Sequence, residues 1–375
     1  MHFALGTTSI LIFVLHKTAA RDDTCRSPSS DDAGNDRFSC ASTDIKWKWD
    51  PTSKSHPCNI HRISHSDLLR LYGPLGLPNL YPYPLVIYPD DVDSNNNNQG
   101  DGSKYRTRRN EFFANLTSID NLPKQFSADF NVTLTGSDSL SSHRRIVPLT
   151  QYLEEVIIGN QHIGFPGETL PYQLGNETWY LFGETFTSEW ANFLQNYQLP
   201  SCHSCTELHY QQHLVALSFG IGNIGSGVQW HLHGPGFSET IHGRKHWVLY
   251  PPQLRPEYDL NYASRHWMEN VYPVLDDWNS LDVEKERHGH VEYLQKWKST
   301  KQEGAAQKSV KDPDDAKDED NGPSNKKPWE CTIHEGEMIY FPDGWHHATI
   351  NLESYTVFVS SFTSEHVSTL EETSK

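Results

Sequence analysis

Two histidines one residue apart, His231 and His233, close the segment Gly225-Ser-Gly-Val-Gln-Trp-His-Leu-His233. Imidazole is a common ligand of Zn, Cu, Fe and Ni, so this spacing could place two ligands on one metal ion. The chain holds 21 histidines in 375 residues, and (21/375)² × 373 gives roughly one His-x-His pair by chance. The pair therefore needs support from the rest of the sequence.

A second segment, Gly336-Glu-Met-Ile-Tyr-Phe-Pro-Asp-Gly-Trp-His-His-Ala-Thr-Ile-Asn351, could complete the site. It predicts a strand, a turn at Asp343-Gly344 and a returning strand that starts near His347. Because side chains alternate between the faces of a strand, His347 and Asn351 would share one face, as would the two histidines of the first pair. This hairpin would present a third imidazole at the mouth of a barrel.

The sequence contains another His-x-His pair, His288-Gly-His290, which serves as a comparison. It lies in the charged stretch Asp282 to Tyr293, which shows no strand alternation, and Gly289 suits a turn. We expect this pair to bind no metal.

Short strands surround the candidate ligands and are separated by turns rich in glycine and proline, which is typical of a β-barrel or sandwich. We predict this barrel over residues 201–365, followed by a tail at 366–375. Residues 253–329 interrupt it, and the mixed-charge, apolar-poor tract 301–328 predicts disorder. The predicted strands are 213–219, 228–233, 246–250, 338–341, 348–352 and 355–361.

Residues 58–200 predict a mixed α/β part ahead of the barrel, with a polar surface loop near 91–108. A strand is expected at Pro84 to Tyr88. Apolar positions at helical spacing indicate helices at 66–72, 147–158 and 187–197, the last with Trp190, Phe193 and Leu194 facing inward.

The N-terminal residues indicate a secreted or luminal protein. Residues 1–20 combine an apolar run with small residues near Ala20, as in a cleavable signal peptide, and the polar residues 21–57 indicate a flexible leader. No other segment is apolar enough to span a membrane. We therefore expect the secretory pathway, with residence in the endoplasmic reticulum lumen favoured and secretion left open.

Cysteines and glycosylation sequons agree with that route. The six cysteines would meet an oxidising compartment, where six allow 15 pairings, and Cys202-His-Ser-Cys205 favours a local disulfide over a zinc site. The sequons are at Asn115, Asn131 and Asn176. The formal net charge of −17, without a clustered basic face, argues against a nucleic-acid partner.

The two histidine segments together resemble the cupin superfamily, because Gly225-x5-His-x-His233 and Gly336-x5-Pro-x-Gly-x2-His-x3-Asn351 match its two signature halves. More narrowly, Gly243-Arg-Lys-His-Trp-Val-Leu-Tyr-Pro-Pro252 followed by the second half is similar to the Jumonji-C (JmjC) family. The likeness covers roughly residues 58–365. It implies a mainly β protein with N-terminal helices, built on the double-stranded β-helix, or jelly roll, of cupins.

The resemblance implies Fe(II) and 2-oxoglutarate as cofactors, with His231 and His347 as two of the iron ligands. Most members have an acidic residue where this chain has His233, so the metal would have one negative charge fewer here. A third imidazole can still bind a divalent metal, and a different metal or none is an open alternative. In germin-like cupins a glutamate follows the His-x-His pair, which makes Glu239 a further candidate ligand.

Two residues are candidates for the cosubstrate. Lys245 matches the lysine with which one branch of the family binds 2-oxoglutarate, and an ammonium suits a carboxylate. Asn351 would orient a ligand near His347 or bond to the backbone.

These features leave three functions open. The first is an Fe(II)/2-oxoglutarate-dependent hydroxylase that acts on proteins in the secretory pathway. The second is a JmjC module without catalysis that serves as an interaction or regulatory protein, and the third is a germin-like metal-binding cupin that uses Glu239. Histone demethylation is disfavoured, because a luminal protein does not meet chromatin.

Overall fold

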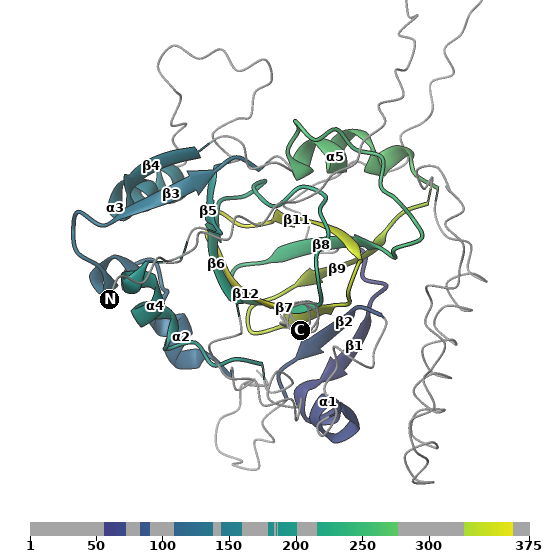
Figure 1. Cartoon of the computed structure of the whole chain (residues 1–375), viewed down its shortest axis with the longest axis horizontal. Coiled ribbons are helices and arrows are strands. Elements are labelled where there is room, and N and C mark those ends of the chain that lie inside the picture. Colours follow the sequence, from purple (N-terminus) through teal and green to yellow (C-terminus); the bar gives the residue numbers. More distant parts are fainter. Residues whose placement is uncertain are drawn as a thin grey trace, which may run out of the picture. The chain divides into compact units, whose positions relative to one another are not determined.

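Two β-sheets form the framework of the chain, as a computed structural model shows (Figure 1). The structure describes residues 56–72, 83–90, 109–137, 144–159, 179–183, 185, 187–200, 216–276 and 326–362. Within these residues the larger sheet has the order β1-β2-β10-β7-β12-β6-β5-β3-β4 and the smaller one the order β11-β8-β9. Apart from the parallel pair β1 and β2, neighbouring strands run antiparallel.

The strands are short, as the sequence predicts, and their bounds are as follows. The larger sheet contains β1 (His61–Ser64), β2 (Leu85–Tyr88), β3 (Asn131–Thr135), β4 (Arg144–Pro148), β5 (Tyr180–Phe182), β6 (Ala216–Gly222), β7 (Gly236–His242), β10 (Met338–Phe341) and β12 (Thr356–Phe362). The smaller sheet contains β8 (Lys245–Tyr250), β9 (Trp329–Ile333) and β11 (His346–Asn351).

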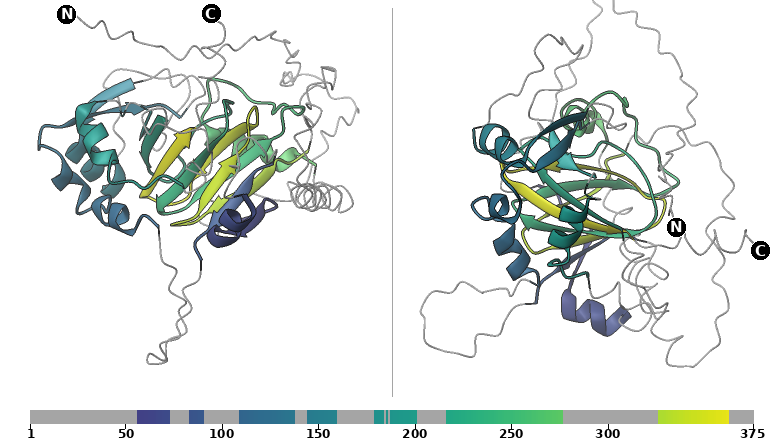
Figure 2. Two further views of the ribbon diagram at one scale, coloured as in Figure 1. Left: turned by 60° about the horizontal axis from the view of Figure 1, so that its bottom comes forward. Right: turned by 60° about the vertical axis from the view of Figure 1, so that its left-hand side comes forward.

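Helices cover the sheets at two ends of the framework. Helices α2 and α4 lie near β3 and β4, whereas α1 lies beside β1 (Figures 1 and 2). The α-helices are α1 (His65–Tyr72), α2 (Glu111–Leu116), α3 (Leu149–Gln151), α4 (Ser188–Leu194) and α5 (Ser264–Asn270). Two 3₁₀ turns, η1 (Leu122–Gln125) and η5 (Tyr272–Val274), and the π-helix η2 (Tyr152–Ile158) complete the described elements.

Apolar side chains on both faces of the small sheet explain why β8 is buried throughout. Trp247 and Leu249 pack with Phe341 of β10, between the two sheets. The alternate residues Val248 and Tyr250 pack on the opposite face, against a cluster that includes α5. The mainly β jelly-roll fold expected from the sequence is thus confirmed.

Helices are present at all three predicted places, but with different bounds: α4 ends at Leu194 instead of residue 197, and residues 152–158 of the second one form a π-helix. Helix α4 follows Thr187, whose side chain accepts a hydrogen bond from Trp190 N, and its inward residues are buried as expected. The helix predicted from residue 147 begins only at Leu149. Val147 is extended and pairs with Val132, because a residue that precedes proline avoids the helical region.

The predicted hairpin between β10 and β11 is wrong. Strand β10 pairs with β2 and β7 in the large sheet, whereas β11 pairs with β8 in the small one. The turn at Asp343-Gly344, with Gly344 at φ 69°, therefore carries the chain from one sheet to the other. Strands that follow each other in sequence pair only if each has a free edge. Strand β10 has β2 and β7 on its two edges, and β11 has β8 on one edge and the segment around His231 on the other.

Residues 228–233 were expected to form a strand, but the structure has only an isolated bridge there, between His231 and His347. Side chains replace part of the backbone ladder, because Thr349 Oγ1 accepts from Val228 N at 3.0 Å and Gln229 Oε1 from Trp230 N at 3.1 Å. Strands β1, β3, β4, β5, β7 and β9 were not predicted from the sequence, nor was α5 within the region that interrupts the barrel.

Several expectations fall outside the described residues. These are the signal peptide at 1–20, the leader to residue 55, the polar loop at 91–108, the tract 301–325 and the tail at 366–375. Among the described residues, no helix is long and apolar enough to cross a membrane.

Candidate metal centre

The three histidines that the sequence predicts as metal ligands, His231, His233 and His347, lie close together in the structure. One ring nitrogen from each of His231, His233 and His347 lies within 4.8 Å of the other two. The ring centroids of His231 and His347 are 4.2 Å apart, and those of His233 and His347 are 4.7 Å apart. This spacing would let all three nitrogens approach one divalent ion.

A backbone carbonyl one or two residues away orients each of the three rings. The Nδ1 atoms of His231, His233 and His347 lie 2.8 Å from the carbonyl oxygens of Gln229, Gly234 and Trp345, respectively. A carbonyl can only accept, so Nδ1 carries the proton and Nε2 keeps its lone pair. Ligating histidines commonly have such a partner on the second nitrogen, because it fixes the tautomer and the ring.

Backbone hydrogen bonds hold the two ligand segments together. His231 N donates to His347 O at 3.0 Å, and His347 N donates to His231 O at 2.9 Å. Farther along, Thr349 N donates to Val228 O at 2.8 Å. Gly227 permits this approach, because a Cβ there would lie 2.0 Å from the carbonyl oxygen of Thr349.

Burial favours the uncharged form of His231 and His347, which metal ligation requires. Loss of hydration lowers the pKa of His231 to about 3, with further contributions from His233 and Lys245. Burial also lowers the pKa of His347 well below its ordinary value, and the two neighbouring imidazoles add to this effect.

Aromatic rings enclose the cluster on its inner side. Phe341 and Trp247 stack on His347 with interplanar angles of 27° and 26°. Phe362 meets His233 edge to face, with the ring centroids 4.7 Å apart. These rings restrict the motion of the imidazoles and keep water away from that side of the centre.

Lys245 and Asn351, the two candidate cosubstrate residues, lie together on paired strands. Lys245 is 1% exposed, and its Nζ donates to Asn351 Oδ1 at 3.4 Å. Nζ also lies 3.4 Å from the centroid of the Phe358 ring, while Asn351 Nδ2 donates to Ser226 Oγ at 3.0 Å. Among the described residues, no carboxylate forms an ion pair with this buried ammonium, whose pKa burial lowers strongly.

Glu239 is buried at another place, held by donors from the N-terminal part. Its Oε2 accepts hydrogen bonds from Arg109, from Asn110 Nδ2 at 2.8 Å and from Tyr197 Oη at 2.8 Å. The group of ligand atoms that converge within 4.8 Å contains the three imidazoles and not this carboxylate. Glu239 thus connects the barrel to the residues that flank α2 and α4.

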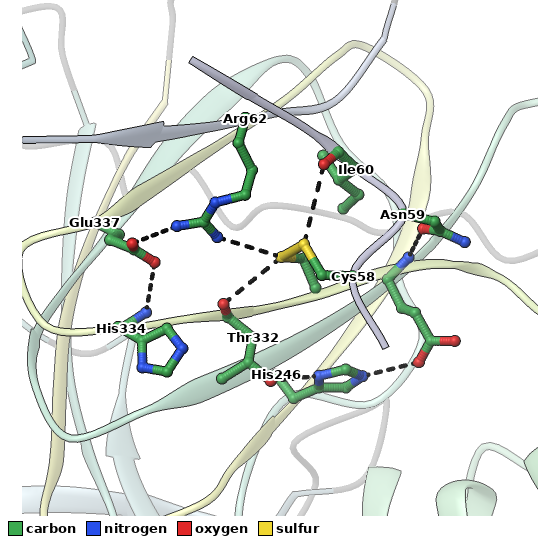
Figure 3. Close-up of a disulfide and its surroundings, with 10 residues drawn as sticks. Cys58, Asn59, Ile60, Arg62, His246, Thr332, His334 and Glu337 are labelled. Carbon is green, nitrogen blue, oxygen red and sulfur yellow. Dashed lines mark hydrogen bonds and ion pairs between the residues drawn. A yellow bond between two sulfur atoms is a disulfide. The ribbon is translucent and has the colours of Figure 1, made fainter. Parts of the chain in front are cut away.

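A disulfide that the sequence could not assign joins Cys58 to Cys331, with Cα atoms 4.0 Å apart (Figure 3). It connects the chain just before β1 to β9, across 273 residues of sequence.

Cys202 and Cys205, the expected pair, lie outside the described residues, as do His288 and His290. Of the sequons, Asn115 and Asn131 are exposed, and Asn176 lies outside the described residues.

Comparisons with known proteins agree with this geometry. Residues 95–366 match the family model of the cupin-like domain. JmjC domain-containing protein 8 of Homo sapiens is 33% identical over 253 residues, which cover 68% of this chain and 72% of that protein. The chain belongs to the cupin-like JmjC family. The JmjC domain-containing protein 8 of Mus musculus is also 33% identical, over 68% of this chain and 70% of that protein.

A more distant JmjC relative is the arginine-specific demethylase JMJ22 of Arabidopsis thaliana, 27% identical over 157 residues. That match covers 38% of this chain and 22% of the relative. The JmjC family assignment agrees with the position of the three histidines at the junction of the two sheets.

Proposed function

We propose that this JmjC protein binds a divalent metal through His231, His233 and His347, and that it uses Fe(II) and 2-oxoglutarate to hydroxylate a protein of the secretory lumen. The observation that carries the proposal is the set of three oriented imidazoles beside a buried lysine without a carboxylate partner among the described residues. A buried cation is costly unless it is paired, so Lys245 fits an anionic ligand.

The residues of the site fit the two cofactors. Neutral imidazole is a suitable ligand for Fe(II), and Nδ1 is already engaged at each ring. Lys245 would bind a carboxylate of 2-oxoglutarate, with Asn351 holding its ammonium in place. When both are bound, O₂ would oxidise a C–H bond of the substrate while 2-oxoglutarate loses CO₂ to become succinate.

Leu232 supports a protein as the substrate. It lies between the first two candidate ligands and is 50% exposed, although it is a large apolar residue. An apolar side chain that is exposed beside a candidate centre can contact an incoming polypeptide.

The luminal location is part of the same proposal. A disulfide between Cys58 and Cys331 would persist in an oxidising compartment, and the exposed Asn115 and Asn131 are accessible to a glycan. Both support the secretory pathway that the first 20 residues suggest.

Metal analysis and turnover test the proposal on the purified chain. Wild type should retain iron and form succinate in an iron-dependent manner, whereas His231→Ala and His347→Ala should lose the metal. His266→Ala changes a histidine outside the cluster and serves as the control. Metal content equal in all four proteins would exclude the site, and manganese or zinc in place of iron would favour a cupin of a different chemistry.

Lys245→Met separates cosubstrate binding from metal binding. This variant keeps the volume of the side chain but removes the charge, so it should retain Mn(II) and lose the thermal stabilisation that 2-oxoglutarate gives to the wild type. Stabilisation of both proteins to the same extent would show that Lys245 does not bind the cosubstrate.

A JmjC module without catalysis is the second candidate, and the imidazole of His233 at the usual acidic position favours it. His233→Asp restores the charge of the common ligand set. If wild type forms no succinate and this variant does, the fold holds both cofactors and the natural protein acts by binding a partner.

A further inference from the structure

The Cys58–Cys331 disulfide, with Arg62, Thr332 and His334 around it, is drawn in Figure 3. It lies beside a cavity of about 170 Å³ that is lined mainly by basic residues. Both cysteines line this cavity, together with the basic residues His56, Arg62, Arg244 and His334 and with Thr332. No carboxylate is among these lining residues, although Arg62 pairs with Glu337 and Arg244 with Glu353 behind them. The cavity thus places four basic side chains next to a disulfide.

The two sulfur-bearing residues differ in their access to solvent. Cys58 is exposed, whereas Cys331 is fully buried. A thiolate from solution would therefore reach the sulfur of Cys58, because exchange requires direct approach to the attacked sulfur.

Arg62 is placed to stabilise the sulfur that would leave. Its Nη1 lies 3.7 Å from Cys331 Sγ, while its Nη2 is bonded to Glu337, which is buried and also accepts from His334 N at 3.1 Å. A guanidinium next to a thiolate lowers the pKa of the thiol, and a thiol of lower pKa leaves faster. Glu337 holds the guanidinium in this position.

We propose that Cys58–Cys331 is a thiol–disulfide exchange site for a small acidic thiol. The thiolate of the incoming molecule forms a bond to Cys58 Sγ, the Cys58–Cys331 bond breaks, and Cys331 leaves as a thiolate beside Arg62. A second thiol molecule then attacks the sulfur of the first one in this mixed disulfide. Cys58 leaves as a thiol, and the two small thiols depart joined to each other as a disulfide. The carboxylates of the incoming thiol bind the basic wall of the cavity.

Exchange would change how the N-terminal edge is attached to the barrel. The disulfide and the hydrogen bonds between Asn59 and Glu330 tie the residues before β1 to β9. After exchange the hydrogen bonds remain, and the covalent tie is lost. The attachment of this edge would thus respond to the thiol content of the compartment.

Kinetics with thiols of different charge test the proposal on the full chain under native conditions. Glutathione is the acidic probe, 2-mercaptoethanol the neutral one and cysteamine the cationic one, compared at equal thiolate concentration. We expect glutathione to react several-fold faster than cysteamine at low salt, with the difference shrinking as salt is added. Peptide mass spectrometry should locate the adduct on Cys58 and a free thiol on Cys331.

Two variants separate the roles of the basic residues. Arg62→Gln should slow exchange with all three thiols by roughly 3- to 10-fold, because it removes the charge beside the leaving sulfur. Arg244 lines the same cavity and pairs with Glu353, so Arg244→Gln should slow the reaction with glutathione and not that with the other two thiols.

The wild type alone can overturn the proposal. A rate that does not depend on thiol concentration would mean that exchange follows global unfolding, and an adduct found on Cys331 would contradict attack at Cys58. Equal rates for the acidic and the cationic thiol would exclude recognition by the basic cavity.

Discussion

At the scale of single residues, the candidate centre depends on which ring nitrogen carries the proton. Backbone carbonyls accept hydrogen bonds from the Nδ1 atoms of all three histidines, so in the uncharged rings each Nε2 keeps its lone pair. In these three hydrogen bonds the backbone, rather than another side chain, selects the tautomer. The arrangement is therefore prepared before any metal binds, but only an uncharged imidazole keeps the Nε2 lone pair that a metal ion needs.

Acid should destabilise the metal-free protein between about pH 6.5 and about pH 3. Burial lowers the pKa of His231 to about 3 and that of His347 well below its ordinary value, whereas the unfolded chain protonates both near pH 6.5. Below that pH the unfolded state binds more protons, so the free energy of unfolding falls with the pH, by at most about 1.4 kcal/mol per pH unit for each histidine. Urea denaturation of chelator-treated protein at several pH values measures this slope.

The double variant His231→Gln and His347→Gln provides the control for this slope. Without the two imidazoles, the free energy of unfolding should depend less steeply on pH over the same interval. A slope as steep as that of the wild type would assign the effect to other groups.

Glu239→Gln should reduce stability without affecting metal binding. The carboxylate is 1% exposed and is bonded to Arg109, so its loss leaves a largely buried guanidinium without its counter-charge. Breaking such a pair costs about 3 kcal/mol, which denaturant unfolding detects. Glu353→Gln is the matched control, because its pair with Arg244 is 44% exposed at the carboxylate and should contribute less than about 1 kcal/mol. Loss of metal in Glu239→Gln would identify this carboxylate as a ligand after all.

At the scale of elements, the candidate site depends on an irregular segment rather than on a strand. Residues 225–233 follow β11 through a few backbone hydrogen bonds, and side chains accept from the backbone N–H groups of Val228 and Trp230. The close approach at Gly227 is what positions His231 opposite His347.

Gly227→Ala should therefore weaken metal binding by roughly tenfold or more. The added Cβ would lie 2.0 Å from the carbonyl oxygen of Thr349, so the segment has to move away from β11 and takes His231 with it. Titration with Mn(II) measures the affinity. Gly183→Ala is the control, because Gly183 has a φ of 88° but no atom within 4 Å of its Cβ position. Equal affinity in both variants would show that the spacing of the segment from β11 is unimportant.

At the scale of the whole molecule, the N-terminal helices and the barrel share one core. Phe113 of α2 and Trp190 of α4 pack on Phe219 of β6, with ring centroids 6.2 Å and 5.2 Å from the Phe219 ring. The same apolar cluster continues to Val359 of β12. Separating the two parts would expose this cluster, so neither part is expected to be stable alone.

We therefore expect the described parts to unfold in a single transition. Far-ultraviolet circular dichroism and tryptophan fluorescence should give the same midpoint. Phe219→Ala should lower this common midpoint, with a loss of about 3–5 kcal/mol, whereas Phe112→Ala should have little effect because Phe112 is 63% exposed. Two separate transitions in the wild type would indicate two independent folding units.

The sequence alone determined the fold class and the three candidate ligands, because these depend on local signals. Short apolar segments located six of the twelve described strands, namely β2, β6, β8, β10, β11 and β12, and His231, His233 and His347 stand at fixed distances from the turns that position them. Lys245 and Asn351 were candidates because of the family resemblance, and the structure places them in contact.

Only the tertiary structure decided which distant groups meet. The separation of β10 and β11 into two sheets, the hydrogen bonds of Glu239 and the pairing of Cys58 with Cys331 each depend on residues far apart in sequence. A local pattern fixes the direction of a side chain along its own element, but not the element that will face it. That choice follows from the packing of the whole barrel, where all the apolar faces have to be buried at once.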